Sequence, residues 1–401
     1  MRFTVNLLVL LGLFIFTSVF AEESWDYRGN VEIEVKAFSN EAKYPLQSST
    51  RSTQSVAINP EFSRNIGEAG RVLFEGFARY DTNDENRTHL DARELNYLHV
   101  GDEYELTVGL ARVFWGVTES RHLVDIINQT DNVENLRGED KLGQSMIHFD
   151  WIKDWGTTSL FALPGFRTRV FNHEEARLSG PVIIDEDNAL FESDQEEMHV
   201  DFAARWTNSY DAWDVGIGAF VGTNREPRLV PSINNGNLLL VPFYDQIKQA
   251  SLDLQMTGEN ILLKLESIYR SSNNEDFVAA VGGFEYTFFG IAESNLDIGV
   301  IMEVLYDGRD NALSPSTNAD DDTAIGLRLA LNDTADTQLL AVLVMDNKDQ
   351  TTLLNVEAER RVADSWKISL EGALFTNVDN ADPLSVIANE DHVTFSAAYY
   401  Y

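Results

Sequence analysis

The chain has 401 residues and no cysteine, so neither a disulfide framework nor a thiolate metal site contributes to its stability. The 65 Asp and Glu residues against 30 Lys and Arg residues give a formal charge of -35. This charge argues against a nucleic-acid partner, because affinity for phosphates comes from clustered basic side chains. A hydrophobic content of 44% excludes a disordered polyanion, and a mean hydropathy of -0.22 excludes a polytopic helical membrane protein.

Residues 1–21 have the features of a cleaved secretory signal. Arg2 precedes an apolar run over residues 7–16, and Val19 and Ala21 are small residues at the spacing that a signal peptidase recognises. The run is shorter than the roughly 20 apolar residues of a membrane-anchoring helix. We therefore expect an exported chain in which residues 22–401 form one domain.

Apolar and polar residues alternate with a period of two over most of the mature chain, which predicts β-strands with two different faces. In chain order the pattern covers residues 31–38, 54–62, 72–80, 90–100, 104–114, 142–151, 157–163, 198–206, 213–221, 250–256, 261–269, 278–288, 296–306, 325–331, 337–346, 352–360, 366–374 and 393–401. The prediction is an all-β protein of about eighteen strands. Sixteen is the alternative, because residues 157–163 and 337–346 are poorly patterned.

The connections alternate between short and long, which predicts an up-and-down antiparallel meander. The long connections are residues 39–53, 116–141, 164–195, 222–247, 307–321 and 377–390. Closing such a meander into a barrel leaves no unpaired sheet edge. Several strands have the ten or so residues that a tilted strand needs to cross a bilayer, and aromatic residues at strand ends suit the two bilayer interfaces. We therefore expect a transmembrane β-barrel.

The last predicted strand places Phe395, Tyr399 and Tyr401 on one face and ends at Tyr401. With this ending, the chain resembles the porin-like outer-membrane β-barrels of Gram-negative bacteria, whose final aromatic residue is an assembly signal for the barrel-assembly machinery. The resemblance implies an even strand number, short periplasmic turns, long extracellular loops and a place in the outer membrane. Outer-membrane lipid and lipopolysaccharide are then expected partners, and a homotrimer stays open.

The segment 112–131 carries a narrower resemblance. Trp115-Gly116 is followed by Asp125, Asn128 and Asp131, and this order is similar to the Trp-Gly and Asp-x-x-Asn-x-x-Asp pattern of an uncharacterised porin-like subgroup. In that subgroup Pro commonly follows the Asn, whereas this chain has Gln129.

If the apolar faces of the strands contact lipid, the opposite faces line an aqueous channel, because barrels of sixteen to eighteen strands are wide enough for one. The predicted channel-lining residues are Arg71, Glu75, Arg79, Asp201, Arg205, Lys264, Glu266, Arg270, Glu303, Arg328, Glu357 and Glu371. Over all inward positions acids outnumber bases, which favours cations. The alternative is that these charges pair locally and produce little net field.

Two long connections are candidates for narrowing the channel. Residues 116–141 directly follow a strand, and they either fold inward as a constriction or stay exposed as an outer loop. Folded inward, they would place at the narrowest point the side chains of Arg121, His122, Asp125, Asp131 and Arg137. Residues 164–195 contain a short apolar run at 181–184, which suits the packing of a plug.

Strict alternation places Arg93 and Arg112 on the lipid face, near the long-loop ends of adjacent strands. There they would contact lipopolysaccharide phosphates. Alternatively, a β-bulge shifts the register and turns both side chains inward.

These observations predict a passive outer-membrane channel for small hydrophilic solutes or ions, with a cation preference, no cofactor and no catalytic activity. The alternative is a non-conducting barrel that acts as an adhesin or surface-binding protein through its acidic loops. A metal site is not expected, because the seven His residues lack zinc-site spacing and residues 81–92 lack the Gly and Glu of a calcium loop. His199 beside Asp201 is the best candidate pair for a hydrolase.

Overall fold

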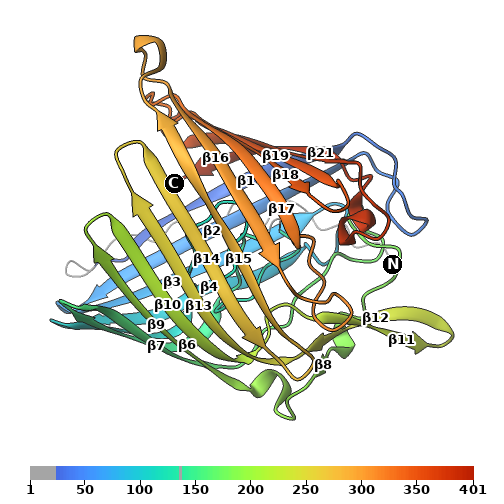
Figure 1. Cartoon of the computed structure of the whole chain (residues 1–401), viewed down its shortest axis with the longest axis horizontal. Coiled ribbons are helices and arrows are strands. Elements are labelled where there is room, and N and C mark those ends of the chain that lie inside the picture. The colour runs from blue at the N-terminus through green and yellow to red at the C-terminus, as the bar shows by residue number, and fades with distance from the viewer. Residues whose placement is uncertain (1–23, 135–137) are drawn as a thin grey trace.

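The computed structural model describes residues 24–134 and 138–401, and most of them belong to one closed antiparallel β-barrel (Figure 1). The expected signal, residues 1–21, lies outside the described residues. The barrel strands are β1 (Asp26–Phe38), β2 (Ser52–Ile66), β3 (Gly70–Asp81), β4 (His89–Val100), β5 (Tyr104–Ala111), β6 (Gln144–Lys153), β7 (Gly156–Pro164), β9 (Val200–Tyr210), β10 (Trp213–Thr223), β13 (Gln246–Thr257), β14 (Ile261–Ser271), β15 (Asp276–Phe288), β16 (Asp297–Asp307), β17 (Asp321–Ala330), β18 (Gln338–Asp346), β19 (Thr352–Ala363), β20 (Trp366–Thr376) and β21 (His392–Tyr400).

Each barrel strand pairs antiparallel with the next, and the last strand pairs with the first, for example Tyr399 opposite Val31. The backbone N–H of Tyr401 donates to the carbonyl of Gly29 at 3.1 Å, so the pairing continues to the final residue. The structure confirms the all-β, up-and-down barrel and the count of eighteen strands in preference to sixteen.

The two faces of each strand have different surroundings, as the alternation predicts. On β16 the outward Met302 and Val304 are 40% and 51% exposed, whereas the inward Glu303 between them is 1% exposed. Phe395 and Tyr399 also point outward with more than a third of their surface exposed. Apolar side chains on the outer surface suit a lipid environment. Among the described residues, no helix has the length and apolar character to cross a membrane.

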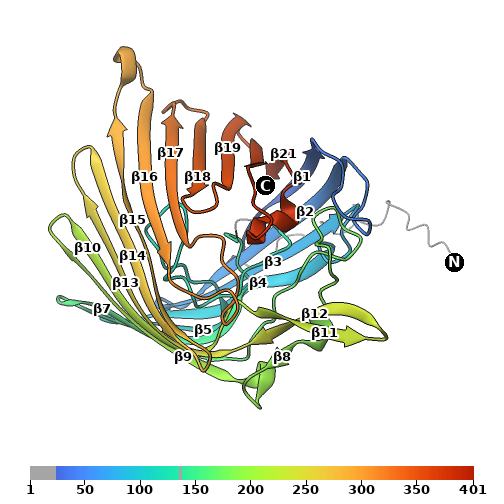
Figure 2. The same ribbon diagram turned by 45° about the vertical axis from the view of Figure 1, so that its right-hand side comes forward.

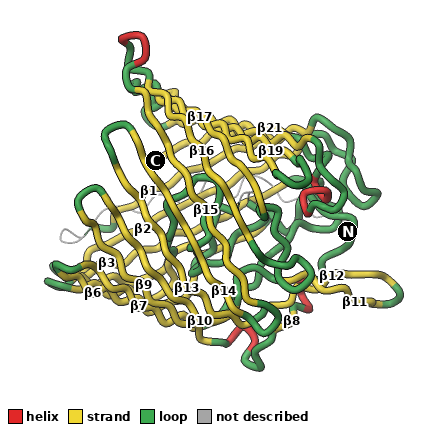
Figure 3. The backbone as a smooth tube through the Cα atoms, viewed as in Figure 1, coloured by secondary structure: helices red, strands yellow, loops and turns green. Residues whose placement is uncertain are grey.

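A second, three-stranded sheet lies beyond one end of the barrel (Figures 1 and 2). It consists of β8 (Leu190–Phe191), β11 (Arg228–Asn234) and β12 (Asn237–Tyr244), within connections that the sequence pattern assigns to loops. We name this side, where the long connections lie, the long-loop end, and the opposite side the short-turn end. The rest of the structure outside the strands consists of loops and short helical turns (Figure 3).

Candidate functional site

The described residues of the connection between β5 and β6, 112–134 and 138–143, fold into the barrel, and we name them the inward loop. Its side chains Val124 and Ile127 are fully covered and belong to one apolar cluster with Ile268 of β14. Burial of an aliphatic side chain of this size stabilises by about 1.5–3 kcal/mol. Of the two arrangements expected for residues 116–141, the structure has the inward one.

Two glutamates on the barrel wall hold the inward loop through its backbone. Glu266 on β14 accepts hydrogen bonds from the N–H groups of Thr118 at 3.0 Å and Val124 at 3.1 Å. Glu303 on β16 accepts one from the N–H of Ser120 at 2.8 Å. Hydrogen bonds to an ionised acceptor are about twice as strong as neutral ones. The wall therefore supplies the acceptors that the buried loop backbone requires.

The polar residues of the motif in segment 112–131 also fix the inward loop. Asp125 pairs with Lys141 at 3.2 Å, which ties the middle of the loop to its end. The Asn128 side-chain amide donates to the carbonyls of Ala111 and Leu142, both at 2.9 Å, and so joins the two flanks of the loop. This spacing of Asp and Asn thus has a structural explanation in loop closure.

Arg93 faces the interior because the pairing of β3 with β4 shifts register between Glu75 and Gly76. Arg93 is 4% exposed, and its guanidinium forms ion pairs with Asp91 at 3.0 Å and with Asp131 of the inward loop. The expected bulge is confirmed, and the lipid-facing position is wrong for Arg93.

Arg112 also turns to the inner face, where it pairs with Glu75 of β3 and lies 3.5 Å from Glu94 of β4. This geometry therefore does not support the expected contact of Arg112 with lipopolysaccharide phosphates.

A cavity of about 460 Å³ lies between the inward loop and the far wall of the barrel. On one side its lining is apolar, with Val342 of β18, Leu353 of β19 and Phe375 of β20. The opposite side is charged and includes Arg225 and Glu226 from the connection after β10. The interior therefore offers both an apolar and a charged surface.

Glu226 is the centre of a basic cluster in this cavity. Its carboxylate lies 2.9 Å from Arg309, 3.2 Å from Arg270 and 3.9 Å from Arg121. Burial opposes its ionisation, but the surrounding guanidinium groups hold the pKa of Glu226 well below its usual value. The carboxylate is thus ionised at neutral pH and partly offsets the positive charge of three arginines.

Of the twelve residues predicted to line a channel, Arg270, Glu357 and Glu371 line this cavity. Ion pairs or hydrogen bonds join six of the others to neighbours: Arg71 to Ser63, Glu75 to Arg112, Arg79 to Glu34, Arg205 to Asp253, Lys264 to Glu119 and Arg328 to Glu285. Local pairing therefore accounts for many of the inward charges.

The remaining three predicted lining residues require a correction. Asp201 and Glu266 are 0% exposed and Glu303 is 1% exposed, so they do not contact a solute in this conformation. The reason is that loops cover them and use them as acceptors. Asp201, for example, is 2.6 Å from Arg225 and also lies 2.7 Å from His199. The pair proposed for hydrolysis thus belongs to a larger buried network.

The five predicted constriction residues separate into three groups. Arg121, His122 and Asp125 line the cavity, and Arg121 donates to the hydroxyl of Thr317 on another loop at 2.6 Å. Asp131 instead contacts the wall through Arg93, as described above. Arg137 lies outside the described residues.

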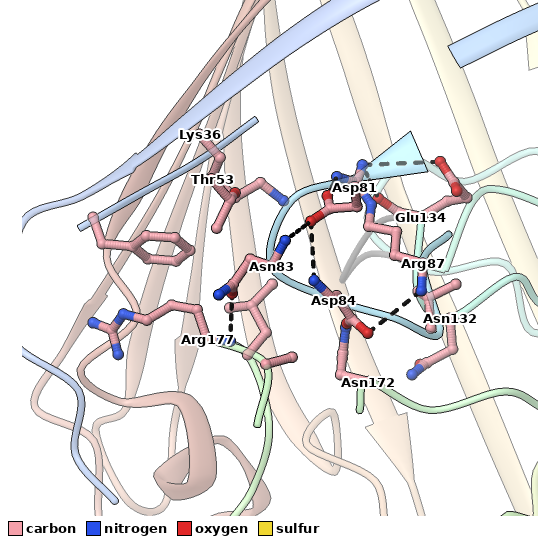
Figure 4. Close-up of a pocket in the computed structure, with 14 residues that line it drawn as sticks. Lys36, Thr53, Asp81, Asn83, Asp84, Arg87, Asn132, Glu134, Asn172 and Arg177 are labelled. Carbon is pink, nitrogen blue, oxygen red and sulfur yellow. Dashed lines mark hydrogen bonds and ion pairs between the residues drawn. The ribbon is translucent and has the colours of Figure 1, made fainter. Parts of the chain in front are cut away.

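The connection between β7 and β9, residues 165–199, packs on other long-loop connections. Arg177 is 1% exposed and pairs with Glu390 at 2.7 Å. Its backbone N–H donates to Asn83 at 3.0 Å, on the turn that precedes β4 (Figure 4). Residues 164–195, expected to suit a plug, thus connect the turn after β3 with the turn before β21.

Sequence patterning did not identify Arg225, Glu226 and Arg309 as interior residues. All three lie in connections, and the alternation of residues along a strand makes no prediction for connections. One signal was available: Arg225 and Arg309 each follow the last residue of a strand by two positions, close enough for the strand to direct the side chain inward.

No protein-family model and no curated protein matches the sequence. Several solved structures share the fold. OccK8 (OprE) of Pseudomonas aeruginosa aligns with a TM-score of 0.56 at 10% identity, over 94% of this chain and 98% of that chain. OccK3 (OpdO) of the same organism aligns with a TM-score of 0.53 at 10% identity, over 94% of this chain and 96% of that chain.

Wzi of Escherichia coli, described as a carbohydrate-binding β-barrel involved in group 1 capsule assembly, aligns with a TM-score of 0.53 at 10% identity. The alignment covers 92% of this chain and 83% of that chain. At such identities the similarity establishes the fold alone, which is the fold of outer-membrane porin-like barrels.

Proposed function

We propose that the protein is an outer-membrane channel through which small hydrophilic solutes or ions diffuse passively. The observation that carries the proposal is the charged cavity of about 460 Å³ inside a closed barrel with an apolar outer surface. In this proposal residues 1–21 are a cleaved signal, residues 22–401 are the barrel domain, and the long-loop end faces the outside. Protein that inserts into planar bilayers but never conducts would contradict it.

The charge of the entrance supports a cation preference. The cavity-lining residues that the structure describes include eight acidic and seven basic side chains, which is nearly balanced. Residues 164–195 at the long-loop end, in contrast, hold seven acids and three bases. A net negative rim raises the local concentration of cations. We therefore propose a modest selectivity that comes from the rim and is modulated by Glu226.

Glu226→Gln is expected to shift the channel toward anions, with a cation-to-anion permeability ratio roughly twofold lower. The substitution removes the only carboxylate within 4.0 Å of all three of Arg121, Arg270 and Arg309 among the described residues. The measurement is the reversal potential in a salt gradient. Glu259→Gln makes the same charge change in an exposed turn at the short-turn end and should leave the ratio unchanged. Equal reversal potentials for Glu226→Gln and wild type would count against this role.

The outer surface supports the proposed partners. Phe395, Tyr399 and Tyr401 lie at the barrel seam and point outward, where assembly machinery or lipid can contact them. We propose these three as the assembly signal. Lipid, lipopolysaccharide and a second or third copy of the chain are the candidates for covering the apolar outer faces.

A second function is favoured by the interlocked loops at the long-loop end. The buried pair of Arg177 and Glu390, and the small sheet of β8, β11 and β12, form an ordered outer surface. A non-conducting barrel that binds a surface polysaccharide or another cell would use such a surface, and the carbohydrate-binding Wzi shares the fold.

Deletion of residues 164–195 distinguishes the two functions. For a channel partly covered by this segment, the deletion should raise single-channel conductance. For a surface-binding barrel it should abolish binding to cells or polysaccharide and leave the electrical behaviour unchanged. The two readouts, bilayer conductance and binding to surface polysaccharide, are measured on the same purified protein.

A further inference from the structure

We propose that His89, Asp131 and Glu134 form a binding site for a first-row divalent metal ion, which fastens the inward loop to the barrel wall. His89 is the first residue of β4, and the two carboxylates belong to the inward loop. One ligand atom from each residue lies within 4.8 Å of the other two. The site is additional to the channel function and does not depend on it.

The spacing of the atoms fits a shared ion better than direct hydrogen bonds. His89 Nε2 lies 3.6 Å from Asp131 Oδ2 and 3.9 Å from Glu134 Oε1. These distances exceed those of N–H···O hydrogen bonds, which fall at about 2.7–3.2 Å. Ligands at about 2.0–2.2 Å from one metal ion are separated by about 3–4 Å. Both measured separations fall in this range.

The orientation of the His89 ring is the one that metal ligands adopt. Its Nδ1 lies 3.1 Å from the carbonyl oxygen of Arg87. A carbonyl can only accept, so Nδ1 carries the proton and Nε2 is left to face the two carboxylates. A metal-bound imidazole typically donates its other N–H to a backbone carbonyl or carboxylate in this way. An Nε2 lone pair that faces two carboxylate oxygens is repelled by them unless a metal ion or a proton lies between.

Two of the three ligand atoms have no hydrogen-bond partner among the described residues. They are His89 Nε2 and Glu134 Oε1, and both are buried. The Glu134 side chain is only 6% exposed, and its other oxygen lies 2.9 Å from Arg79 Nε. Buried polar atoms are rarely left unpaired in native proteins. A metal ion would satisfy both atoms at once.

The surrounding charges leave room for a divalent cation. Ion pairs connect six carboxylates and four guanidinium groups around the site: Glu32, Glu34, Asp81, Asp91, Asp131 and Glu134 with Arg79, Arg87, Arg93 and Arg167. Six negative and four positive charges sum to -2. This excess of negative charge among the ion-paired groups favours a bound cation.

The donor set indicates the class of metal. One imidazole nitrogen and two carboxylate oxygens suit Zn²⁺ and its first-row neighbours, whereas Ca²⁺ and Mg²⁺ prefer oxygen ligands alone. Access is available, because Glu134 lines both the main cavity and the smaller cavity of Figure 4. Water in these cavities can complete the coordination shell.

The test is calorimetric titration of the refolded, EDTA-treated and dialysed full barrel with ZnCl₂ and, separately, with CaCl₂. We expect one zinc site per chain and little response to calcium. His89→Ala and the near-isosteric Glu134→Gln should each weaken zinc binding at least tenfold, because each removes a ligand. The matched control is His148→Ala, since His148 is an interior histidine that pairs with the single carboxylate Asp150 at 3.0 Å.

Circular dichroism establishes that each variant retains the barrel before it is titrated. Should His89→Ala fail to fold, Glu134→Gln decides the question alone, because it preserves the size and the hydrogen-bonding oxygen of the side chain. A folded wild-type barrel that takes up no zinc would overturn the proposal and assign a proton to His89 Nε2 instead. Stoichiometric zinc binding with unchanged affinity in Glu134→Gln would overturn it as well.

Discussion

Replacing Glu266 and Glu303 together by alanine is expected to raise single-channel conductance several-fold. Both carboxylates accept hydrogen bonds from backbone N–H groups of the inward loop. A hydrogen bond to a charged group contributes about 1.5–3 kcal/mol, and a buried N–H that loses its acceptor has a further cost. The loop should therefore leave the interior of the double variant, and bilayer recordings should show a wider channel.

Asp253→Ala is the matched control for this variant. Asp253 is also an inward carboxylate, on the strand next to β14, but its partner is Arg205 of the wall at 2.8 Å. Its removal should change conductance much less. Each single glutamate variant should have a smaller effect than the double one, because the two anchors hold the same segment. A double variant with wild-type conductance would show that other contacts, such as those of Asn128, are sufficient to hold the loop.

The barrel itself was predictable because each strand places apolar side chains toward lipid on one face and polar side chains toward the interior on the other. Residues such as Met302, Glu303 and Val304 follow this alternation strictly, so the sequence pattern and the observed exposure agree. Arg93 breaks the alternation. Because placing a guanidinium group in lipid has a free-energy cost, a β-bulge that turns the side chain inward was the alternative to a lipid-facing position. The structure has that bulge.

The hairpin of β11 and β12 was missed although the sequence contains a signal for it. Asn235-Gly236 is a typical two-residue hairpin turn, and both residues have positive φ, 50° and 85°. The flanking strands contain Pro231 and Pro242. Proline cannot donate a backbone hydrogen bond to a neighbouring strand, so these residues argue against a strand in the sequence pattern. Turn chemistry was the better guide here than alternation.

The interior site was predictable only in part, because loops supply most of it. The alternation along the strands identified Arg270 and Glu303 as inward. It could not show that the inward loop covers Glu303 or that Glu226 lies among arginines. Of the proposed metal ligands, Asp131 and Glu134 are three residues apart, but His89 lies on strand β4, far earlier in the chain, so no spacing motif signals the full set. Such groups meet only when the inward loop is packed against the wall.

Arg177→Met is expected to lower the free energy of local opening of the connection between β7 and β9 by about 3–5 kcal/mol, because it leaves the buried carboxylate of Glu390 without its ion-pair partner. Arg177 and Glu390 are 1% and 0% exposed at their side chains. Hydrogen exchange of residues 165–199 measures the effect. The double variant Arg177→Met/Glu390→Leu should recover much of the protection, because an apolar pair has no charge to desolvate.

The defect of Arg177→Met should depend on pH in a defined direction. Burial raises the pKa of Glu390 above its usual value, and Arg177 opposes this rise. Without Arg177 the pKa is raised further, so the closed loop binds a proton more tightly than the open one. Closure must then become more favourable as the pH falls through that pKa. After correction for intrinsic rates, hydrogen exchange of residues 165–199 in the variant should be fastest near pH 8 and should become slower toward pH 5. A defect of equal size at both pH values would show that Glu390 is not the group left unpaired.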